Sequence, residues 1–294
     1  MDDLRRADDL IADDPYLTGA YLCLTISADR EVRDAVASLL AGLETDVGLG
    51  NEFTGTDPMP AVAYLTRVRC DDGDMADDEL ASADVVVHVA APDEDLVHRY
   101  ERALRASLVD GVSMRALFGQ WLPMEYTGRA MHNFSYAHRV LQQPGDVAPN
   151  CFLLPLSKTP EWWSKSWMER HTYLLPRYDE RGQLVAEGHV LSAAAGIDHL
   201  LRRTYRQRSG AAELGQYDFL TYFECTDDGV SHLHATLDAL RDTRRNPEWA
   251  FVREGPLWQG RRHLSAEACL ATIAIWCRVR CSSEPELGPG PAGR

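Results

Sequence analysis

A histidine among small residues is the first candidate for metal chemistry in this 294-residue sequence. His189 lies in AEGHVLSAAAG, where a predicted helix carries little side-chain bulk, so that a flat cofactor could lie close to its surface. An imidazole in such a place is a natural axial ligand for haem iron. A polar residue near a helix end would explain the same local pattern.

A dense group of arginines follows within LLRRTYRQR, a segment that predicts a strand. Alternation would divide its residues between two faces, with Arg202, Thr204 and Arg206 on one and Arg203, Tyr205 and Gln207 on the other. If the face of Arg202 lines a barrel interior, its guanidinium groups, which never lose their charge, would form a basic site for an anion. A solvated edge strand is the alternative interpretation.

Two adjacent tryptophans, Trp162 and Trp163, lie in EWWSKSW. Neighbouring residues cannot share a face in a helix or a strand, so one ring can pack in the core while the other contacts a ligand. Aromatic residues are usually core residues, but three tryptophans in seven residues suit a large apolar guest.

The composition limits the partners of the chain. A formal net charge of −15 argues against nucleic acid and against an anionic membrane surface. No window is apolar for long enough to cross a bilayer, and the acidic N-terminus does not resemble a signal peptide, so we expect a cytoplasmic protein. Seven cysteines without a C-x-x-C pair fit free thiols in a reducing compartment. The nucleotide, zinc-protease and serine-hydrolase signatures are absent.

The elements that must position these residues alternate between strands and helices in both halves. The first half predicts strands from Ala20 and over 60–70 and 83–91, with helices over 29–44 and 92–108. An acidic loop is expected over 71–82 and irregular structure over 110–150. The second half predicts strands over 151–158, 200–207, 217–225 and 248–262, and helices around His189 and over 229–245.

This order predicts an α+β fold of two ferredoxin-like halves, packed as a dimeric α+β barrel with helices outside. The expected division is an acidic lead-in (1–17), an N-terminal half (18–125), a linker (126–149), a C-terminal half (150–262), a helix (263–281) and a disordered tail (282–294).

Three motifs together resemble the chlorite dismutase and coproheme decarboxylase superfamily. They are PLSKTPEWW, the spacing from His189 to Arg202 followed by Tyr205, and YDFLTYFEC. The resemblance covers residues 150 to 262, while the N-terminal half agrees only in the order of its elements. It implies a dimeric α+β barrel that binds haem b or coproheme in the C-terminal half.

The resemblance also implies roles for single residues. His189 would be the proximal ligand of the iron, and Arg202 would be the distal arginine that holds chlorite above it. Lys158 and Trp162 or Trp163 match positions that line the haem pocket.

The sequence departs from the family at three places. Leu154 stands where coproheme decarboxylases have a tyrosine, so decarboxylation by that route is not expected. The glutamate that supports the proximal histidine would fall near residues 243–245, where Asp242 is the only nearby acid. An insertion, HTYLLPRYDERGQLVAEG, precedes His189, and its His171 is a rival ligand.

The expected function is that of a haem b-dependent oxidoreductase that acts on a small oxyanion or peroxide at a histidine-ligated iron beneath a distal arginine. A specialised haem enzyme acting on a nitrogen-containing small molecule is one alternative. A non-catalytic haem carrier or sensor, which would not need Arg202, is another, and a structural barrel without a cofactor is the third. We expect a small-molecule or anionic oxidant as partner, no nucleic acid, no membrane, and a homo-oligomer.

Overall fold

The computed structural model describes residues 17–47, 62–91, 93–121, 149–196, 199–206, 215–263, 265–269 and 271–272. Of the acidic lead-in expected over 1–17 and the linker expected over 126–149, only Leu17 and Pro149 are among these residues. The tail expected over 282–294 lies outside them.

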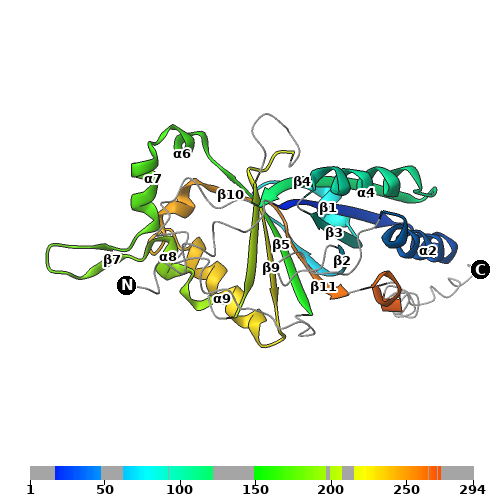
Figure 1. Ribbon diagram of the computed structural model, residues 1–294. Helices are drawn as coiled ribbons and strands as arrows, with labels where there is room; N and C mark the ends of the chain where they lie inside the picture. The colour runs from blue at the N-terminus through cyan, green and yellow to red at the C-terminus, as the bar shows by residue number, and fades with distance from the viewer. Residues whose placement is uncertain are drawn as a thin grey trace, which may run out of the picture.

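The N-terminal half forms a four-stranded antiparallel sheet with its two long helices on one face (Figure 1). Its elements are β1 (Leu17–Ile26), α2 (Arg30–Val47), β2 (Val62–Asp71), α3 (Asp78–Ser82), β3 (Val85–Ala91), α4 (Glu94–Ala106) and β4 (Val112–Trp121). The predicted strands and helices of this half are confirmed. The segment expected to be irregular contains β4, and the expected acidic loop contains α3.

The C-terminal half has the same plan with more insertions. Its elements are β5 (Asn150–Lys158), α6 (Pro160–Ser164), α7 (Trp167–Leu174), β6 (Arg177–Tyr178), β7 (Leu184–Ala186), α8 (Gly188–Ser192), a 3₁₀ turn η1 (Ala194–Gly196), β8 (Leu201–Arg206), β9 (Phe219–Cys225), α9 (Gly229–Arg241), a second 3₁₀ turn η2 (Pro247–Phe251), β10 (Val252–Glu254) and β11 (Leu257–His263). The single strand expected over 248–262 was wrong: this segment is η2 and two strands, because Gly255 and Pro256 interrupt the ladder. Of the helix expected over 263–281, residues 266–269 and 271–272 are described and are helical.

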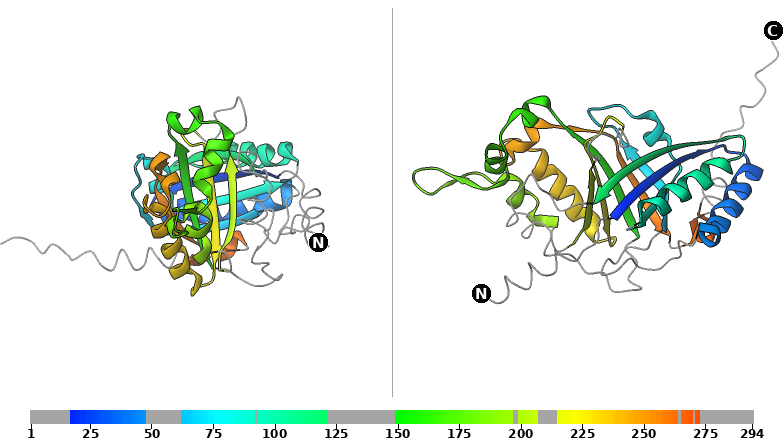
Figure 2. Two further views of the ribbon diagram at one scale, coloured as in Figure 1. Left: turned by 90° about the vertical axis from the view of Figure 1, so that its left-hand side faces the viewer. Right: turned by 45° about the horizontal axis from the view of Figure 1, so that its top comes forward.

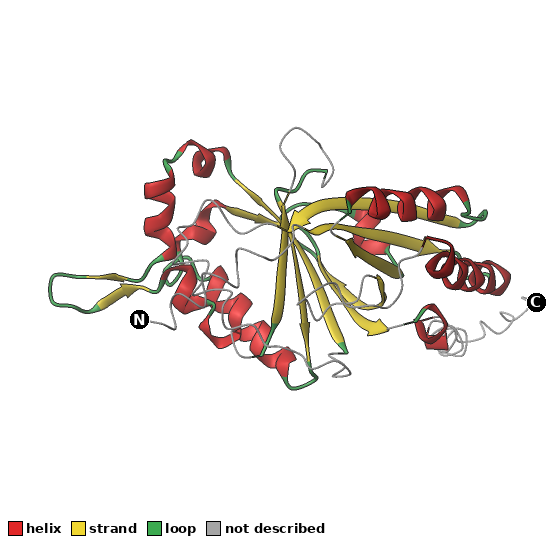
Figure 3. Ribbon diagram, in the orientation of Figure 1, coloured by secondary structure: helices red, strands yellow, loops and turns green. Residues whose placement is uncertain are grey.

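The strands close into one barrel, which confirms the predicted fold class. Pairing runs in the order β5, β11, β2, β3, β1, β4, β8, β9, and β9 returns to β5. Figures 2 and 3 show the helices outside this barrel, with α2 and α4 over the N-terminal strands and α9 over β5 and β9. No helix among the described residues is long and apolar enough to cross a bilayer.

Alternation along the strands produces three apolar clusters. One fills the barrel and includes Tyr21, Leu153, Tyr205 and Trp258. The other two lie on the outer faces of the two half-sheets, one beneath α2 and α4 and the other beneath α9. The second outer cluster matters for the site, because it identifies the face of β5 and β9 that looks toward the helices of the C-terminal half.

The barrel interior also holds a buried polar network. Arg262 Nη1 lies 2.9 Å from Glu224 Oε2, and the Tyr222 hydroxyl donates to Glu224 Oε1 at 2.5 Å. His88 Nε2 lies 3.0 Å from the Tyr205 hydroxyl, and its ring stacks on Tyr222. His88 is thus a core residue whose Nε2 is hydrogen-bonded, while its buried Nδ1 has no hydrogen-bond partner among the described residues.

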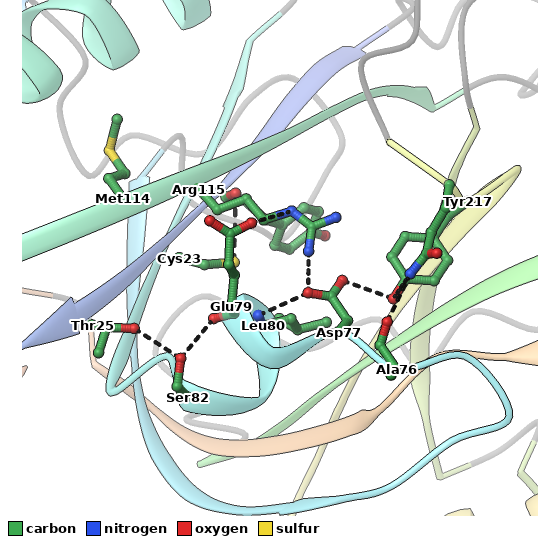
Figure 4. Close-up of polar contacts among 12 residues, drawn as sticks. Cys23, Thr25, Ala76, Asp77, Glu79, Leu80, Ser82, Met114, Arg115 and Tyr217 are labelled. Atoms are coloured by element: carbon green, nitrogen blue, oxygen red, sulfur yellow. Dashed lines mark hydrogen bonds and ion pairs between the residues drawn. The ribbon is translucent and has the colours of Figure 1, made fainter.

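A second polar cluster joins the two halves (Figure 4). Asp77 forms an ion pair with Arg115 of β4 and accepts a hydrogen bond of 2.8 Å from the Tyr217 hydroxyl, which lies just ahead of β9. The same carboxylate caps α3 by accepting from the amide of Leu80. All of its oxygens are thus used in holding one short helix against both half-sheets, which is a structural role.

Candidate functional site

A positive backbone angle and a close contact position His189 on α8. Gly188 has φ +65°, and a Cβ at this position would lie 2.5 Å from the carbonyl oxygen of Leu175, so only glycine fits here. The amides of Glu187 and Gly188 donate to the carbonyl oxygen of Arg245 at 2.8 and 3.0 Å. The start of α8 is therefore fixed from two sides, by the end of α7 and by the segment after α9.

The acidic partner of His189 is Glu248. Its Oε2 lies 2.8 Å from His189 Nδ1, and its Oε1 accepts a hydrogen bond of 2.5 Å from Lys158 Nζ. The Glu248 and Lys158 side chains are only 3% and 5% exposed, while that of His189 is 16% exposed. Three elements far apart in the sequence, β5, α8 and η2, thus meet at one carboxylate.

The sequence placed the supporting acid near residues 243–245, where only Asp242 is nearby, and so left the partner of His189 unlocated. Asp242 instead accepts hydrogen bonds from the backbone amide and the side chain of Arg244, and lies at the C-terminal end of α9. Glu248 was missed because the segment EWAFVRE was interpreted as strand. The signal that could have found it is Pro247, which commonly begins a helical turn and here places Glu248 in the first turn of η2.

The Glu248 carboxyl is held in its ionised form. Burial alone would raise the pKa of the Glu248 carboxyl, but the adjacent Lys158 ammonium and His189 imidazole outweigh burial and hold this pKa well below its usual range. Burial lowers the pKa of Lys158, and the Glu248 charge opposes that change. Because an ionised carboxylate only accepts, His189 Nδ1 donates in this hydrogen bond, and Nε2 is the ring nitrogen that remains for a metal.

The two adjacent tryptophans have different surroundings, as their spacing predicted. Trp162 is fully buried, and Lys158 Nζ lies 4.4 Å from its ring centroid. Trp163 is 42% exposed and donates from Nε1 to Asp218 Oδ2 at 3.3 Å. Its ring also stacks on Phe219. Trp162 thus packs beside the Lys158–Glu248 pair, while Trp163 extends the outer face of β9.

Arg202 lies on β8 opposite Phe223, a member of the cluster beneath α9, and so belongs to the outer face of the barrel. Arg203 and Tyr205 point the other way, into the barrel interior, where Arg203 Nη1 donates to the Tyr205 hydroxyl at 3.4 Å. The division of β8 into two faces is confirmed. The condition that the face of Arg202 lines the barrel interior is not met, because this face carries Phe223 and the cluster beneath α9.

Leu154 and His171 also have definite places. Leu154 is buried on the outer face of β5 and pairs with Thr221 of β9, whose hydroxyl lies 3.3 Å from that of Thr204. His171 lies on α7, and its buried Nδ1 has no hydrogen-bond partner among the described residues. No contact given by the structure joins His171 to the group around Glu248.

The donor set fits haem in its chemistry. Haem iron takes its four equatorial ligands from the porphyrin, so a protein needs to supply only one axial imidazole. An imidazole whose Nδ1–H is held by a carboxylate presents Nε2 in a fixed orientation, the usual arrangement for a metal-ligating histidine. His189, supported by Glu248 and Lys158, has this arrangement. Among the described residues no group of three or more His, Cys, Asp or Glu side chains could hold a metal ion.

Comparison with known proteins gives structural relatives only. No protein-family model and no curated protein sequence matches the chain. A variant of chlorite dismutase from Candidatus Nitrospira defluvii superposes with a TM-score of 0.63 at 17% identity, over 90% of this chain and 99% of that chain. The imidazole complex of the same enzyme gives a TM-score of 0.62 at 17% identity, over 92% and 99% of the two chains. The provisionally named chlorite dismutase TA0507 gives 0.58 at 11%, over 88% and 99%. The chain therefore has the fold of these chlorite dismutase structures, which is the fold that its motifs predicted.

Proposed function

We propose that the chain is a haem-dependent oxidoreductase that acts on a small oxyanion such as chlorite, or on peroxide, with His189 as the axial ligand of haem b. The observation that carries this proposal is the contact of 2.8 Å between His189 Nδ1 and Glu248 Oε2, with Lys158 on the second carboxylate oxygen. When bound, haem would supply oxidation and reduction at its iron. The similarity in fold to chlorite dismutases supports the same class.

The Lys158–Glu248–His189 group would set the properties of the axial ligand. Glu248 holds the Nδ1 proton of His189, which fixes the tautomer and the ring orientation and makes Nε2 more basic. Lys158 keeps the buried carboxylate ionised and stops it from taking that proton completely. A strongly basic imidazole stabilises a more highly charged metal, which favours an enzyme that oxidises over a carrier that only holds haem.

Arg202 would bind the anionic oxidant. The chain carries a net charge of −15, so an anion approaches it against the mean field and needs a local cation. Arg202 is a guanidinium on the outer face of β8. It pairs across the ladder with the apolar Phe223, and the hydroxyls of Thr204 and Thr221 lie two residue pairs further along. A cation in apolar surroundings attracts an anion more strongly than one in water does.

Haem binding is tested by titration of purified protein with haem. The expected result is a Soret band that saturates at one haem per chain, and its loss in His189→Ala but not in His171→Ala. Retention of the band in His189→Ala together with its loss in His171→Ala would overturn the ligand assignment.

Activity is then measured with chlorite at an oxygen electrode and with peroxide and a chromogenic donor. A protein that binds haem stoichiometrically but turns over neither oxidant faster than free haem would be a haem carrier or sensor, and the proposed activity would be wrong.

A further inference from the structure

The insertion ahead of His189 forms a hairpin that stands away from the barrel (Figure 1). Its strands β6 and β7 pair antiparallel with each other and, among the described residues, form a sheet of their own. An isolated two-stranded hairpin is at best marginally stable in water. Because no third strand among the described residues pairs with this sheet, the outer edges of β6 and β7 present backbone groups to which a further strand could bind.

The turn of this hairpin is specified by its sequence. The Asp179 carboxylate accepts hydrogen bonds from the amides of Arg181 and Gln183 at 2.9 and 2.8 Å. Gly182 takes the left-handed conformation with φ +74°, and its amide donates to the carbonyl of Asp179. An Asx turn closed by a left-handed glycine is a standard hairpin connection, so the sequence of this segment itself specifies the hairpin.

Large apolar side chains are exposed on the hairpin and on α7, which leads into it. Between 38% and 64% of each of six residues is exposed: Trp167, Met168, Leu175, Tyr178, Leu184 and Val185. Tyr178 and Leu184 lie directly opposite each other across the two strands. On the hairpin itself, Tyr178, Leu184 and Val185 are each at least 47% exposed, so its two strands present apolar side chains to a partner.

The charge of this segment favours a second copy of the chain as its binding partner. Residues 165–186 carry four cations and three carboxylates, which gives a net charge of +1: Lys165, Arg170, Arg177 and Arg181 against Glu169, Asp179 and Glu180. The rest of the chain therefore carries more than the whole net charge of −15. Two copies repel each other wherever their acidic surfaces meet. Because residues 165–186 are nearly neutral, two copies of this segment can approach each other without that repulsion.

We propose that the hairpin is a two-fold contact between two copies of this chain, in which β7 pairs antiparallel with β7 of the second copy. The pairing would extend two strands to a four-stranded sheet and cover Leu184 and Val185 on both copies. A two-fold axis brings the same strand of each copy together in opposite directions, which is the geometry that antiparallel pairing needs. This inference does not rest on the proposed haem chemistry.

Sedimentation velocity tests the contact with Val185→Asp, which places a charge on the paired edge of each copy. The expected result is an assembly with half the mass of the wild type at the same concentration, with an unchanged far-ultraviolet circular dichroism spectrum and unchanged haem uptake. The matched control is Val68→Asp on β2, since Val68 is 40% exposed and lies in the barrel. A wild-type monomer, or equal masses for wild type and Val185→Asp, would overturn the proposal.

Cross-linking gives a second test that does not depend on the stability of the charged variant. Residues that face each other across antiparallel strands have Cβ atoms about 4.5–5.5 Å apart, close to the range that a disulfide spans. Val185→Cys is therefore expected to form a disulfide-linked dimer on mild oxidation, and Val68→Cys is not. Equal linkage in the two variants, or none in Val185→Cys, would contradict the two-fold pairing of β7.

Discussion

The carbonyl oxygen of Arg245 accepts hydrogen bonds from the amides of Glu187 and Gly188, so Arg245 fastens the backbone ahead of Glu248 to the backbone ahead of His189. The Arg245 side chain strengthens the same joint, because its Nη2 lies 2.9 Å from Glu187 Oε2. The contact between His189 and Glu248 is thus set by two short backbone segments and does not depend on the reach of long side chains. Substitutions that disturb the contacts between Arg245 and Glu187 are therefore expected to change the position of His189 directly.

The first prediction concerns the charge of Glu248. Glu248→Gln keeps a hydrogen-bond acceptor for His189 but removes the negative charge that makes the imidazole basic. The variant is expected to bind haem, to show a higher ferric/ferrous reduction potential, and to lose roughly 10–100-fold in turnover. Spectroelectrochemistry measures the potential, and Asp242→Asn, at the acid that binds Arg244, is the control. Equal potentials in wild type and Glu248→Gln would show that the carboxylate does not act on the iron.

The second prediction compares two glycines with positive φ. Gly182 has no heavy atom within 4 Å of a built Cβ, so Gly182→Ala is expected to cost only the left-handed backbone penalty, about 1–2 kcal/mol of unfolding free energy. Gly188→Ala meets the Leu175 carbonyl as well and is expected to cost at least about 1 kcal/mol more. Urea denaturation measures both variants. If Gly188→Ala is no less stable than Gly182→Ala, the close contact at the start of α8 is not what fixes this helix.

The elements that the sequence predicts well are those whose own periodicity is strong. The β-branched run VVVHV of β3 and the apolar spacing of α2 and α4 identify these elements without tertiary information. The strand β4 was missed because its pairing partner β1 specifies it. Gly119 there faces Gly19 of β1, and the Tyr205 side chain packs on both glycines, where a Cβ on Gly119 would lie 2.8 Å from Tyr205 Cβ. Glycine has a low strand propensity, and the reason for it here is packing against a tyrosine far away in the sequence. The local sequence of β4 therefore does not predict a strand.

The candidate site also contains residues that the sequence indicates and others that only the tertiary structure reveals. His189, Arg202 and Lys158 could be selected from residue type and motif, and the two faces of β8 follow from alternation alone. Glu248 was not selected: Pro247 indicates the turn that carries it, but its role arises from a contact between residues 59 positions apart in the sequence. Which face of β8 lies inside the barrel is also decided in three dimensions, by the closure of β9 onto β5.

The third prediction separates two adjacent arginines. Arg202→Ala is expected to keep the fold and haem but to lose most turnover and most affinity for small anions such as azide, measured by absorbance titration. Arg203→Ala removes a buried cation from the barrel interior, where its charge opposes the rise in pKa that burial causes at Glu224, and is expected to cost about 3 kcal/mol of unfolding free energy. Equal losses of turnover and stability in the two variants would contradict the assignment of these side chains to opposite faces.

The last prediction concerns acid stability and His88. Burial lowers the pKa of His88 to about 3, whereas the imidazole of an unfolded chain binds a proton below about pH 6.5. Protons therefore bind preferentially to the unfolded chain between these values, and His88 makes the protein less stable as the pH falls from 6.5 to 3. The loss is about 1.4 kcal/mol per pH unit over this window.

His88→Phe removes this titration and also the hydrogen bond to the Tyr205 hydroxyl, which is worth about 1 kcal/mol. The variant is thus expected to be less stable than the wild type at pH 7 and more stable at pH 4, so that the two curves of unfolding free energy against pH cross. Tyr205→Phe is the control: it loses the same hydrogen bond but keeps the imidazole, and its curve should run below that of the wild type at both pH values. Curves for wild type and His88→Phe that stay parallel would show that His88 is not the buried group that makes the barrel sensitive to acid.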